Sequence, residues 1–149
     1  MQTLNLLSAL SVAPELERDL AGFIKDLDRA ELDPKIRALA RLAVSRLNEC
    51  PYDIHHHELE ARQAGVEADK LEALRRGLRT PFNQAELLVI QLATRMAGND
   101  HRLPIMMRTN LVREFGRRGL VELCLNMGMA HLTNRCNQAL GVELEANAL

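Results

Sequence analysis

Apolar residues recur at every third or fourth position along much of the chain, a spacing that places them on one face of an α-helix. The pattern predicts one amphipathic helix over residues 15–30 and another over residues 34–47. Asp33 and Pro34 mark the start of the second helix, because aspartate caps a helix N-terminus and proline fits the first position. A shorter helix is expected over residues 67–76, closed near Gly77. The pattern therefore predicts an all-α fold.

A later segment carries apolar residues on most of its surface. Asn83 and Glu86 form a capping-box pattern, and a run of large aliphatic residues follows from Leu87 to Leu92. A helix with so little polar face is expected to be buried, either by its own core or by a partner.

The C-terminal third is expected to contain two helices. Asn99–Asp100 should cap the first, Gly116 and Gly119 should interrupt the chain after it, and the last helix should span residues 120–139. This last helix is also broadly apolar. Two such helices in a small domain predict contacts between copies of the chain, so we expect a homo-oligomer.

The length of 149 residues predicts a single domain over residues 1–149, a bundle of about six or seven helices. Residues 1–13 are expected to form an N-terminal arm that packs on the domain or on a neighbouring subunit. Its apolar run, Leu4 to Val12, is too short to span a bilayer and lacks the basic residues that precede the apolar core of a signal peptide.

The composition limits which binding partners and which cellular compartment are expected. The net charge of −1 gives no electrostatic reason to expect nucleic acid or an anionic membrane as a partner. A small basic cluster, Arg75, Arg76 and Arg79, stands beside acidic residues and is interpreted as a solvated helix face. Three cysteines cannot all pair within the chain, so a reducing, cytoplasmic location is expected.

Chemically active side chains gather between residues 50 and 57, which read C-P-Y-D-I-H-H-H. Pro51 suits the first position of a helix, which makes Cys50 the expected N-cap residue. The partial positive charge at a helix N-terminus favours a thiolate, so we expect a lowered pKa for this thiol. Asp53 and His57 are four residues apart and should share a helix face with Cys50. These three residues form the candidate catalytic site, which is expected to act on a small-molecule substrate without a cofactor.

Each of these residues also has a structural interpretation. A free cysteine such as Cys50 is commonly buried and inert. Asp53 can simply accept backbone N–H bonds in the first turn, and its negative charge would oppose ionisation of the thiol. His57 can be a hydrogen-bonded core histidine, while His55 and His56 are expected at the surface.

A metal site is a further alternative. The three candidate residues are acceptable zinc ligands, and a fourth would have to come from His56, His101 or His131. Their spacing matches no established zinc motif, so no metal is predicted. Cys124 and Cys136 fall within a helical pattern and are expected to pack in the core.

The stretch around Cys50 resembles the alkylhydroperoxidase AhpD-like and carboxymuconolactone decarboxylase superfamily. Peroxidase members of that superfamily carry C-x-x-C-x-x-x-H at the start of a helix, followed by an alanine- and arginine-rich run that ends in Ala-Gly. This chain has C-P-Y-D-I-H-H-H and then E-A-R-Q-A-G. The preceding L-D-P-K-I-R-A-L-A-R-L-A-V-S-R-L-N and the later P-F-N-Q-A-E-L-L-V-I-Q-L-A and T-N-R-C-N are also similar to family helices. The resemblance covers about Leu32 to Leu140 and implies an AhpD-like helical bundle whose helices are shared in an oligomer.

Two departures from the family pattern bear on activity. Cys50 matches the first motif cysteine and His57 the motif histidine, but Asp53 stands at the position of the second cysteine. The family's proton-relay glutamate falls at Ala38. Without a second thiol, the intramolecular disulfide that such peroxidases form and reduce cannot exist here. Further along, Asn134 and its neighbour Arg135 match a family helix and are expected to hold structure or to line the pocket.

The resemblance implies a thiol-dependent oxidoreductase that acts on hydroperoxides. Cys50 would be the reactive thiol, His57 its base or proton shuttle, and Asp53 an orienting or proton-carrying group in place of the resolving thiol. The sulfenate formed would need an external thiol as reductant. One alternative is a lyase or isomerase similar to carboxymuconolactone decarboxylase, in which His57 does acid–base work on a small carboxylic substrate. Another is an oligomeric binding or scaffold protein without catalysis.

Overall fold

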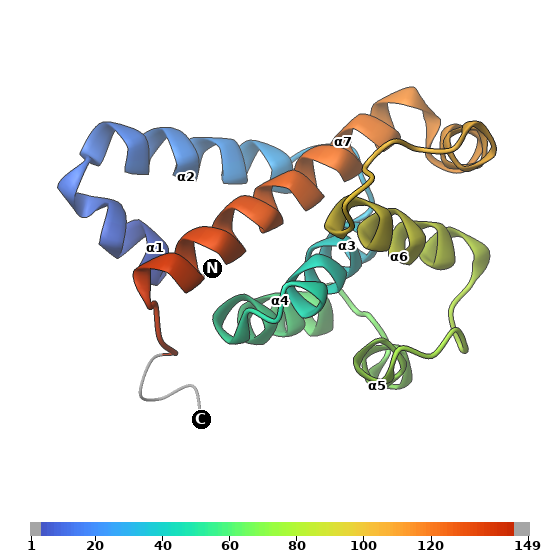
Figure 1. Ribbon diagram of the computed structural model, residues 1–149, viewed down its shortest axis with the longest axis horizontal. Coiled ribbons are helices and arrows are strands. Elements are labelled where there is room, and N and C mark those ends of the chain that lie inside the picture. The colour runs from blue at the N-terminus through green and yellow to red at the C-terminus, as the bar shows by residue number, and fades with distance from the viewer. Residues whose placement is uncertain (1–3, 145–149) are drawn as a thin grey trace.

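The computed structural model describes residues 4–144, which form seven α-helices and one short 3-10 helix and contain no strand. The predicted all-α fold is confirmed (Figure 1). In chain order the elements are α1 (Leu4–Ala9), η1 (Leu10–Val12), α2 (Pro14–Asp28), α3 (Pro34–Leu47), α4 (Pro51–Gln63), α5 (Ala68–Arg76), α6 (Gln84–Ala97) and α7 (Ile105–Leu140).

Most helix ends follow the local sequence. The Asp33 carboxylate accepts the backbone N–H groups of residues 35 and 36 at the start of α3, and Asn83 and Glu86 form a complete capping box on α6. Helix α5 stops at Gly77, whose φ of 68° lies in the left-handed region that glycine tolerates. These caps confirm the predicted starts of α3 and α6 and the predicted end of α5.

The start of α7 differs from the prediction. Asn99–Asp100 caps no helix, and α7 begins only at Ile105, after Pro104. A residue that precedes proline is disfavoured in the helical region of φ and ψ, so a helix that includes Leu103 would be interrupted at once. The Asp100 carboxylate instead forms an ion pair with Arg95 at 2.6 Å and stabilises the loop.

Helix α7 is bent at Gly116, where φ is 72° and ψ is 172°. The predicted interruption is therefore confirmed at Gly116. It is wrong at Gly119, which lies within the helix, because the chain regains helical geometry directly after the kink rather than at Leu120.

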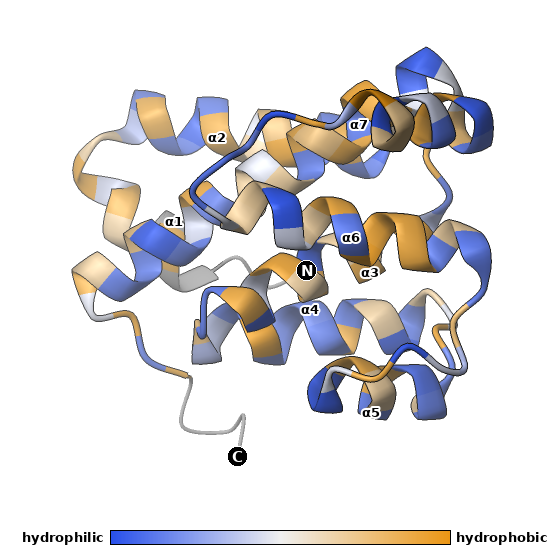
Figure 2. Cartoon of the chain, turned by 45° about the vertical axis from the view of Figure 1, so that its right-hand side comes forward, coloured by the Kyte–Doolittle hydropathy of each residue, from blue (hydrophilic) through white to orange (hydrophobic). Residues whose placement is uncertain are grey.

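Helix α3 occupies the centre of the molecule, with α4, α6 and α7 packed against it. Figure 2 shows hydrophobic stretches along α6, and the buried face of that helix closes the core against α3 and α7. The main core cluster consists of Leu32, Leu39, Ala40, Ala43, Val44, Ala73, Phe82, Leu88, Val89, Leu92, Ala93, Leu111, Leu123, Met127 and Ala130. Cys124 packs against this cluster from a half-buried position. Within residues 4–144, no helix has the length and apolar character needed to cross a bilayer.

The described part of the N-terminal arm packs on the domain itself. Helices α1 and α2 both contact α7, and Leu6 of α1 is buried. In Figure 1 the α1–α2 pair lies along the C-terminal half of α7. The arm thus covers one side of the region where α4 and α7 meet.

Candidate functional site

The three candidate residues lie at the start of α4, as predicted. Cys50 is the N-cap residue and Pro51 the first helical residue. The Cys50 thiol donates a hydrogen bond to Oδ2 of Asp53 across 3.7 Å. Asp53 and His57 are both buried on the same helix. The structure therefore brings the sulfur, the carboxylate and the imidazole into one region.

Two asparagine side chains of α7 hold the carboxylate of Asp53. Nδ2 of Asn134 donates to Oδ2 at 2.5 Å, and Nδ2 of Asn137 donates to both carboxylate oxygens at 3.1 Å. Oδ1 of Asn134 accepts a hydrogen bond from Asn48 at 2.8 Å. This amide is thus fully engaged, and it fixes α4 against α7 at the candidate site.

Ser45 determines the protonation pattern of His57. The hydroxyl of Ser45 has one proton, which it donates to the carbonyl oxygen of Arg41 at 3.0 Å, and it accepts an N–H from Asn134 at 3.1 Å. Nδ1 of His57 lies 2.9 Å from the same hydroxyl oxygen. All three contacts are satisfied together only if Nδ1 carries the proton and donates it. Nε2 is then the basic nitrogen of the ring.

A buried arginine forms the third part of the site. Nη1 of Arg41 lies 2.8 Å from a carboxylate oxygen of Asp28 on α2 and 2.8 Å from one of Glu60 on α4. Its Nε donates to Asn126 on α7 at 2.9 Å. Nη2 is buried and has no hydrogen-bond partner among the residues that the structure describes. A buried donor without a partner is costly, so this atom is suited to bind an acceptor from a ligand or water.

These groups surround a cavity of about 550 Å³ beneath the N-terminal arm. Its walls come from α1, α2, α3, α4 and α7 and include Asp53, His57 and Arg41. The remaining lining residues are Leu6, Leu20, Ile24, Asp28, Arg37, Tyr52, His56, Leu59, Glu60, Gln63, Met129, Thr133 and Asn137. Cys50 does not line the cavity and is only 1% exposed. The common cavity therefore holds the carboxylate and the imidazole but not the sulfur.

Burial shifts the pKa of both the His57 imidazole and the Cys50 thiol. Burial lowers the pKa of His57, while the negative charges of Asp53 and Glu60 oppose that change in part. Burial also raises the pKa of the Cys50 thiol, and the charge of Asp53 raises it further. The nearby backbone amides of Tyr52 and Asp53 act in the opposite direction but do not prevail. The lowered thiol pKa predicted from the helix N-terminus is thus wrong, because desolvation outweighs the helix.

Several polar residues of the site were not singled out from the sequence, among them Ser45, Arg41 and Asn137. Ser45 and Arg41 are buried on α3 beside the apolar stripe that the sequence predicts, and Asn137 lies one turn after Asn134. The pattern that could have identified Asn137 is the repetition of buried amides along an otherwise apolar helix, which cannot remain buried without polar partners.

The remaining predicted residues have structural positions. Ala38 is 1% exposed and packs in a small apolar cluster with Leu42 and Ala61. No carboxylate therefore stands at the family's relay position. No group of three or more His, Cys, Asp or Glu side chains within residues 4–144 is arranged to hold a metal ion.

Comparison with known proteins adds a family and a fold. The model of the carboxymuconolactone decarboxylase family matches residues 14–95. The uncharacterised protein YnjA of Escherichia coli strain K12 is 24% identical over 115 residues, which are 76% of this chain. The match spans only 63% of YnjA, so the chain covers less than two thirds of that relative.

Solved structures of low sequence identity share the fold. A peroxidase-related protein from Silicibacter sp. TM1040 superposes with a TM-score of 0.85 at 21% identity, covering 97% of this chain and 78% of its own. The debrominase Bmp8, solved with 2,3,4-tribromopyrrole, gives 0.84 at 19% identity with the same coverage. A protein of unknown function from Agrobacterium tumefaciens, described as an AhpD candidate in antioxidant defence, gives 0.80 at 17%, covering 93% and 97%.

Proposed function

Because the chain belongs to the carboxymuconolactone decarboxylase family, we propose that it is a lyase or isomerase that moves a proton on a small carboxylate substrate. His57 is the acid–base group. The observation that supports this most directly is the hydrogen bond from Nδ1 of His57 to Ser45, which leaves Nε2 basic on a ring that lines the cavity.

The substrate carboxylate would bind to Arg41. Its unpartnered Nη2 is a charged donor on the wall of the cavity, and a carboxylate oxygen is a strong acceptor for it. Asp28 and Glu60 already share Nη1, so this arginine is held in place before the substrate arrives. A cavity of about 550 Å³ is within the size range of small-molecule sites.

The proton transfer balances without a cofactor. Nε2 of neutral His57 removes a proton from the carbon beside a carbonyl group, and returning it at another carbon gives the isomer. In a decarboxylation, CO2 leaves and the electron pair of the breaking C–C bond stays on the product carbon. That carbon then receives a proton from the imidazolium that His57 forms by taking up a proton from solvent. The charge of Asp53 stabilises the imidazolium in either case.

Carboxymuconolactone turnover tests the proposal with three variants. We expect His57→Gln to lower kcat by roughly 100-fold or more, and Cys50→Ser to leave it nearly unchanged. Ser45→Ala keeps the imidazole of His57 but removes the hydroxyl that fixes the proton on Nδ1. Its kcat should therefore fall less than that of His57→Gln, and the pH dependence of its kcat should shift. Full activity of His57→Gln would contradict the proposal, as would loss of activity in Cys50→Ser or no turnover of carboxylated lactones by the wild type.

A thiol-dependent peroxidase is a second candidate, favoured by the 3.7 Å contact between the Cys50 thiol and Asp53. Asp53 lines the cavity and would take the thiol proton. The thiolate then attacks the hydroperoxide, an alcohol leaves, and an external thiol reduces the sulfenic acid that remains. The burial of Cys50 weighs against this reaction.

Hydroperoxide consumption with dithiothreitol as the external thiol tests this second function. Wild-type turnover that is lost in Cys50→Ser would support it. Equal consumption by the two proteins would exclude Cys50 as the reactive thiol.

A further inference from the structure

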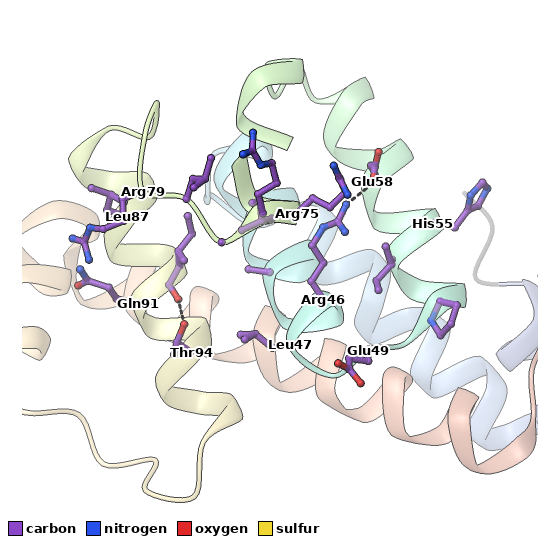
Figure 3. A pocket seen from close by; sticks show the side chains of 18 of the residues that line it. Arg46, Leu47, Glu49, His55, Glu58, Arg75, Arg79, Leu87, Gln91 and Thr94 are labelled. Atoms are coloured by element: carbon purple, nitrogen blue, oxygen red, sulfur yellow. Dashed lines mark hydrogen bonds and ion pairs between the residues drawn. The ribbon is translucent and has the colours of Figure 1, made fainter. Parts of the chain in front are cut away.

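A second cleft, of about 1100 Å³, lies on the other side of α4 from the cavity lined by Asp53, His57 and Arg41, which we call the catalytic cavity. Its walls are the end of α3, α4, α5 with the following turn, and α6. Figure 3 shows this space between α4 and α6, with Arg46 extending from α3 toward Glu58. Neither Asp53 nor Cys50 lines this cleft, and Leu59 of α4 is its one residue shared with the catalytic cavity.

Positive charge is concentrated in this cleft. Five arginines line it, Arg46, Arg62, Arg75, Arg76 and Arg79, against two glutamates, Glu49 and Glu58. The whole chain has a net charge of −1, so this local excess is a property of the cleft and not of the protein. We therefore name it the arginine cleft.

Ion pairs neutralise only part of this charge. Glu58 is shared by Arg46 at 2.6 Å and Arg62 at 2.7 Å, so one carboxylate faces two guanidinium groups. Nε of Arg46 is buried without a hydrogen-bond partner in the described part of the chain. Arg75 is paired with Glu72, whereas Arg76 and Arg79 are exposed and form no ion pair within residues 4–144. The end of the cleft nearest α5 thus carries two exposed guanidinium groups.

The rest of the arginine cleft is aliphatic. Its apolar lining consists of Ala43, Leu47, Pro51, Ile54, Leu59, Leu74, Leu78, Leu87 and Ile90. Of these, Leu47, Leu59 and Leu78 are each more than two fifths exposed, although leucine is usually buried. No Phe, Tyr or Trp lines the cleft, and its one aromatic ring is the imidazole of His55.

We propose that the arginine cleft binds an acyl carboxylate, an unbranched aliphatic chain with one terminal anionic group. The chain would cover the exposed leucines, and the carboxylate would bind Arg76 and Arg79, since guanidinium groups bind carboxylates through paired hydrogen bonds. This site is separate from the catalytic cavity and does not depend on the activity proposed there.

A second copy of the chain is a poorer fit. The exposed apolar stripe of α7 is Val121, Leu125 and Leu132. Arg117 and Arg135 flank that stripe in the sequence, while Arg118 is already paired with Glu31 and Glu122. Docking the stripe into the arginine cleft would bring arginines against arginines, which is unfavourable.

Calorimetric titration of the wild-type chain with octanoate, decanoate and dodecanoate tests the proposal. Each two added methylene groups should tighten binding by roughly tenfold, as expected for burial of an aliphatic chain. The neutral 1-decanol should bind several-fold more weakly than decanoate. Decyl phosphate shows whether the site prefers a carboxylate or accepts any anionic head group; binding of either anion with the same chain-length dependence supports the site.

Two double variants with the same change in charge locate the site. Arg76→Gln with Arg79→Gln should weaken decanoate binding by roughly fivefold. Arg108→Gln with Arg117→Gln, at exposed positions on α7 outside the cleft, should leave it unchanged. Leu78→Asn should weaken decanoate more than octanoate if the chain lies along the aliphatic wall.

Three results would overturn the proposal. One is equal decanoate affinity in the two double variants, and another is affinity independent of chain length. The third comes from sedimentation equilibrium: a wild-type oligomer that fails to bind decanoate and dissociates on Leu78→Asn would show that the arginine cleft is filled by a second copy.

Discussion

The hydroxyl of Ser45 links the ionisation of His57 to the packing of α3 against α7. It contacts the Arg41 carbonyl, the Asn134 amide and Nδ1 of His57 at once. Arg41 lies on α3, Asn134 on α7 and His57 on α4. The tautomer of His57 therefore depends on the positions of these three helices. A single hydroxyl therefore connects the fold to the proposed chemistry.

Burial of neutral His57 makes stability depend on pH. The pKa of His57 is lowered in the folded protein, whereas an unfolded histidine titrates near about 6.5. As the pH falls below that value, the unfolded chain binds a proton that the folded chain resists, so the free energy of unfolding decreases. Between pH 7 and pH 5.5 we expect a loss of roughly 1 kcal/mol from this residue, measured by urea denaturation.

His57→Gln should remove that part of the pH dependence. His55→Gln, on a face of α4 that lines the arginine cleft, should keep it. A smaller slope remains in His57→Gln, because the pKa of His131 is also lowered by burial. An unchanged slope in His57→Gln would mean that His57 is not buried in its neutral form.

Cys50 should be the slowest of the three cysteines to react with iodoacetamide in the native protein. It is 1% exposed, whereas Cys124 and Cys136 are half-buried. Burial raises the pKa of the Cys50 and Cys124 thiols alike, so access to the sulfur sets this order. Peptide mass spectrometry after timed alkylation would measure this order, with protein in urea as the control in which all three react. Rapid modification of native Cys50 would instead favour the peroxidase function.

The sequence identified part of this site and not the rest, for physical reasons. Cys50, Asp53 and His57 lie within eight residues, so helical spacing alone places them near one another. The partners that define their chemistry are distant in sequence: Ser45 is 12 residues from His57, and Asn137 is 84 residues from Asp53. Burial of the thiol is likewise a result of tertiary packing that a cap position does not reveal.

At the scale of helices, two glycines of α7 have opposite roles. Gly116 adopts φ 72° and ψ 172°, a region that residues with a side chain rarely occupy. Gly128 lies in regular helix, and an added Cβ at either position would meet no atom within 4 Å. Any difference between the effects of alanine on stability at the two positions must therefore come from backbone conformation and not from side-chain contacts.

Gly116→Ala should destabilise the protein by about 1–3 kcal/mol, because alanine is strained at the kink. Gly128→Ala should stabilise it by roughly 0.5–1 kcal/mol, because alanine favours the helix and loses less entropy on folding. Urea denaturation of the two variants gives the comparison directly. Effects of the same sign would show that α7 is not kinked at Gly116 in solution.

Helix boundaries were predictable where a cap is local and failed where two signals compete. The Asn83–Glu86 capping box and the Asp33–Pro34 start are complete within four residues, and both were correct. At Asn99–Asp100 the cap residues were present, but Pro104 prevented the helix from forming until Ile105. The proline restricts the backbone sterically, and that restriction outweighs the weak preference of Asp100 for a cap.

At the scale of the whole molecule, Arg41 joins four helices. It belongs to α3 and binds Asp28 of α2, Glu60 of α4 and Asn126 of α7, with a side chain only 3% exposed. Helices α2, α4 and α7 are thus held to α3 by one guanidinium group. The Nη2 atom of this same guanidinium group is the donor proposed to bind the substrate in the cavity. One residue therefore serves both the packing of the helices and the proposed binding of substrate.

Arg41→Met should therefore destabilise the protein by about 3–5 kcal/mol, because it leaves Asp28 and Glu60 near each other without the cation between them. Arg37→Met is the matched control: its ion pair with Asp28 is long, at 3.9 Å, and its loss should cost under about 1 kcal/mol. Adding Asp28→Asn and Glu60→Gln to Arg41→Met should restore much of the lost stability, since the uncompensated charges are then removed. If urea denaturation shows no recovery in the triple variant, the methionine variant is destabilised by lost packing rather than by buried charge. Equal stability of Arg41→Met and Arg37→Met would instead mean that the four helices do not depend on this arginine.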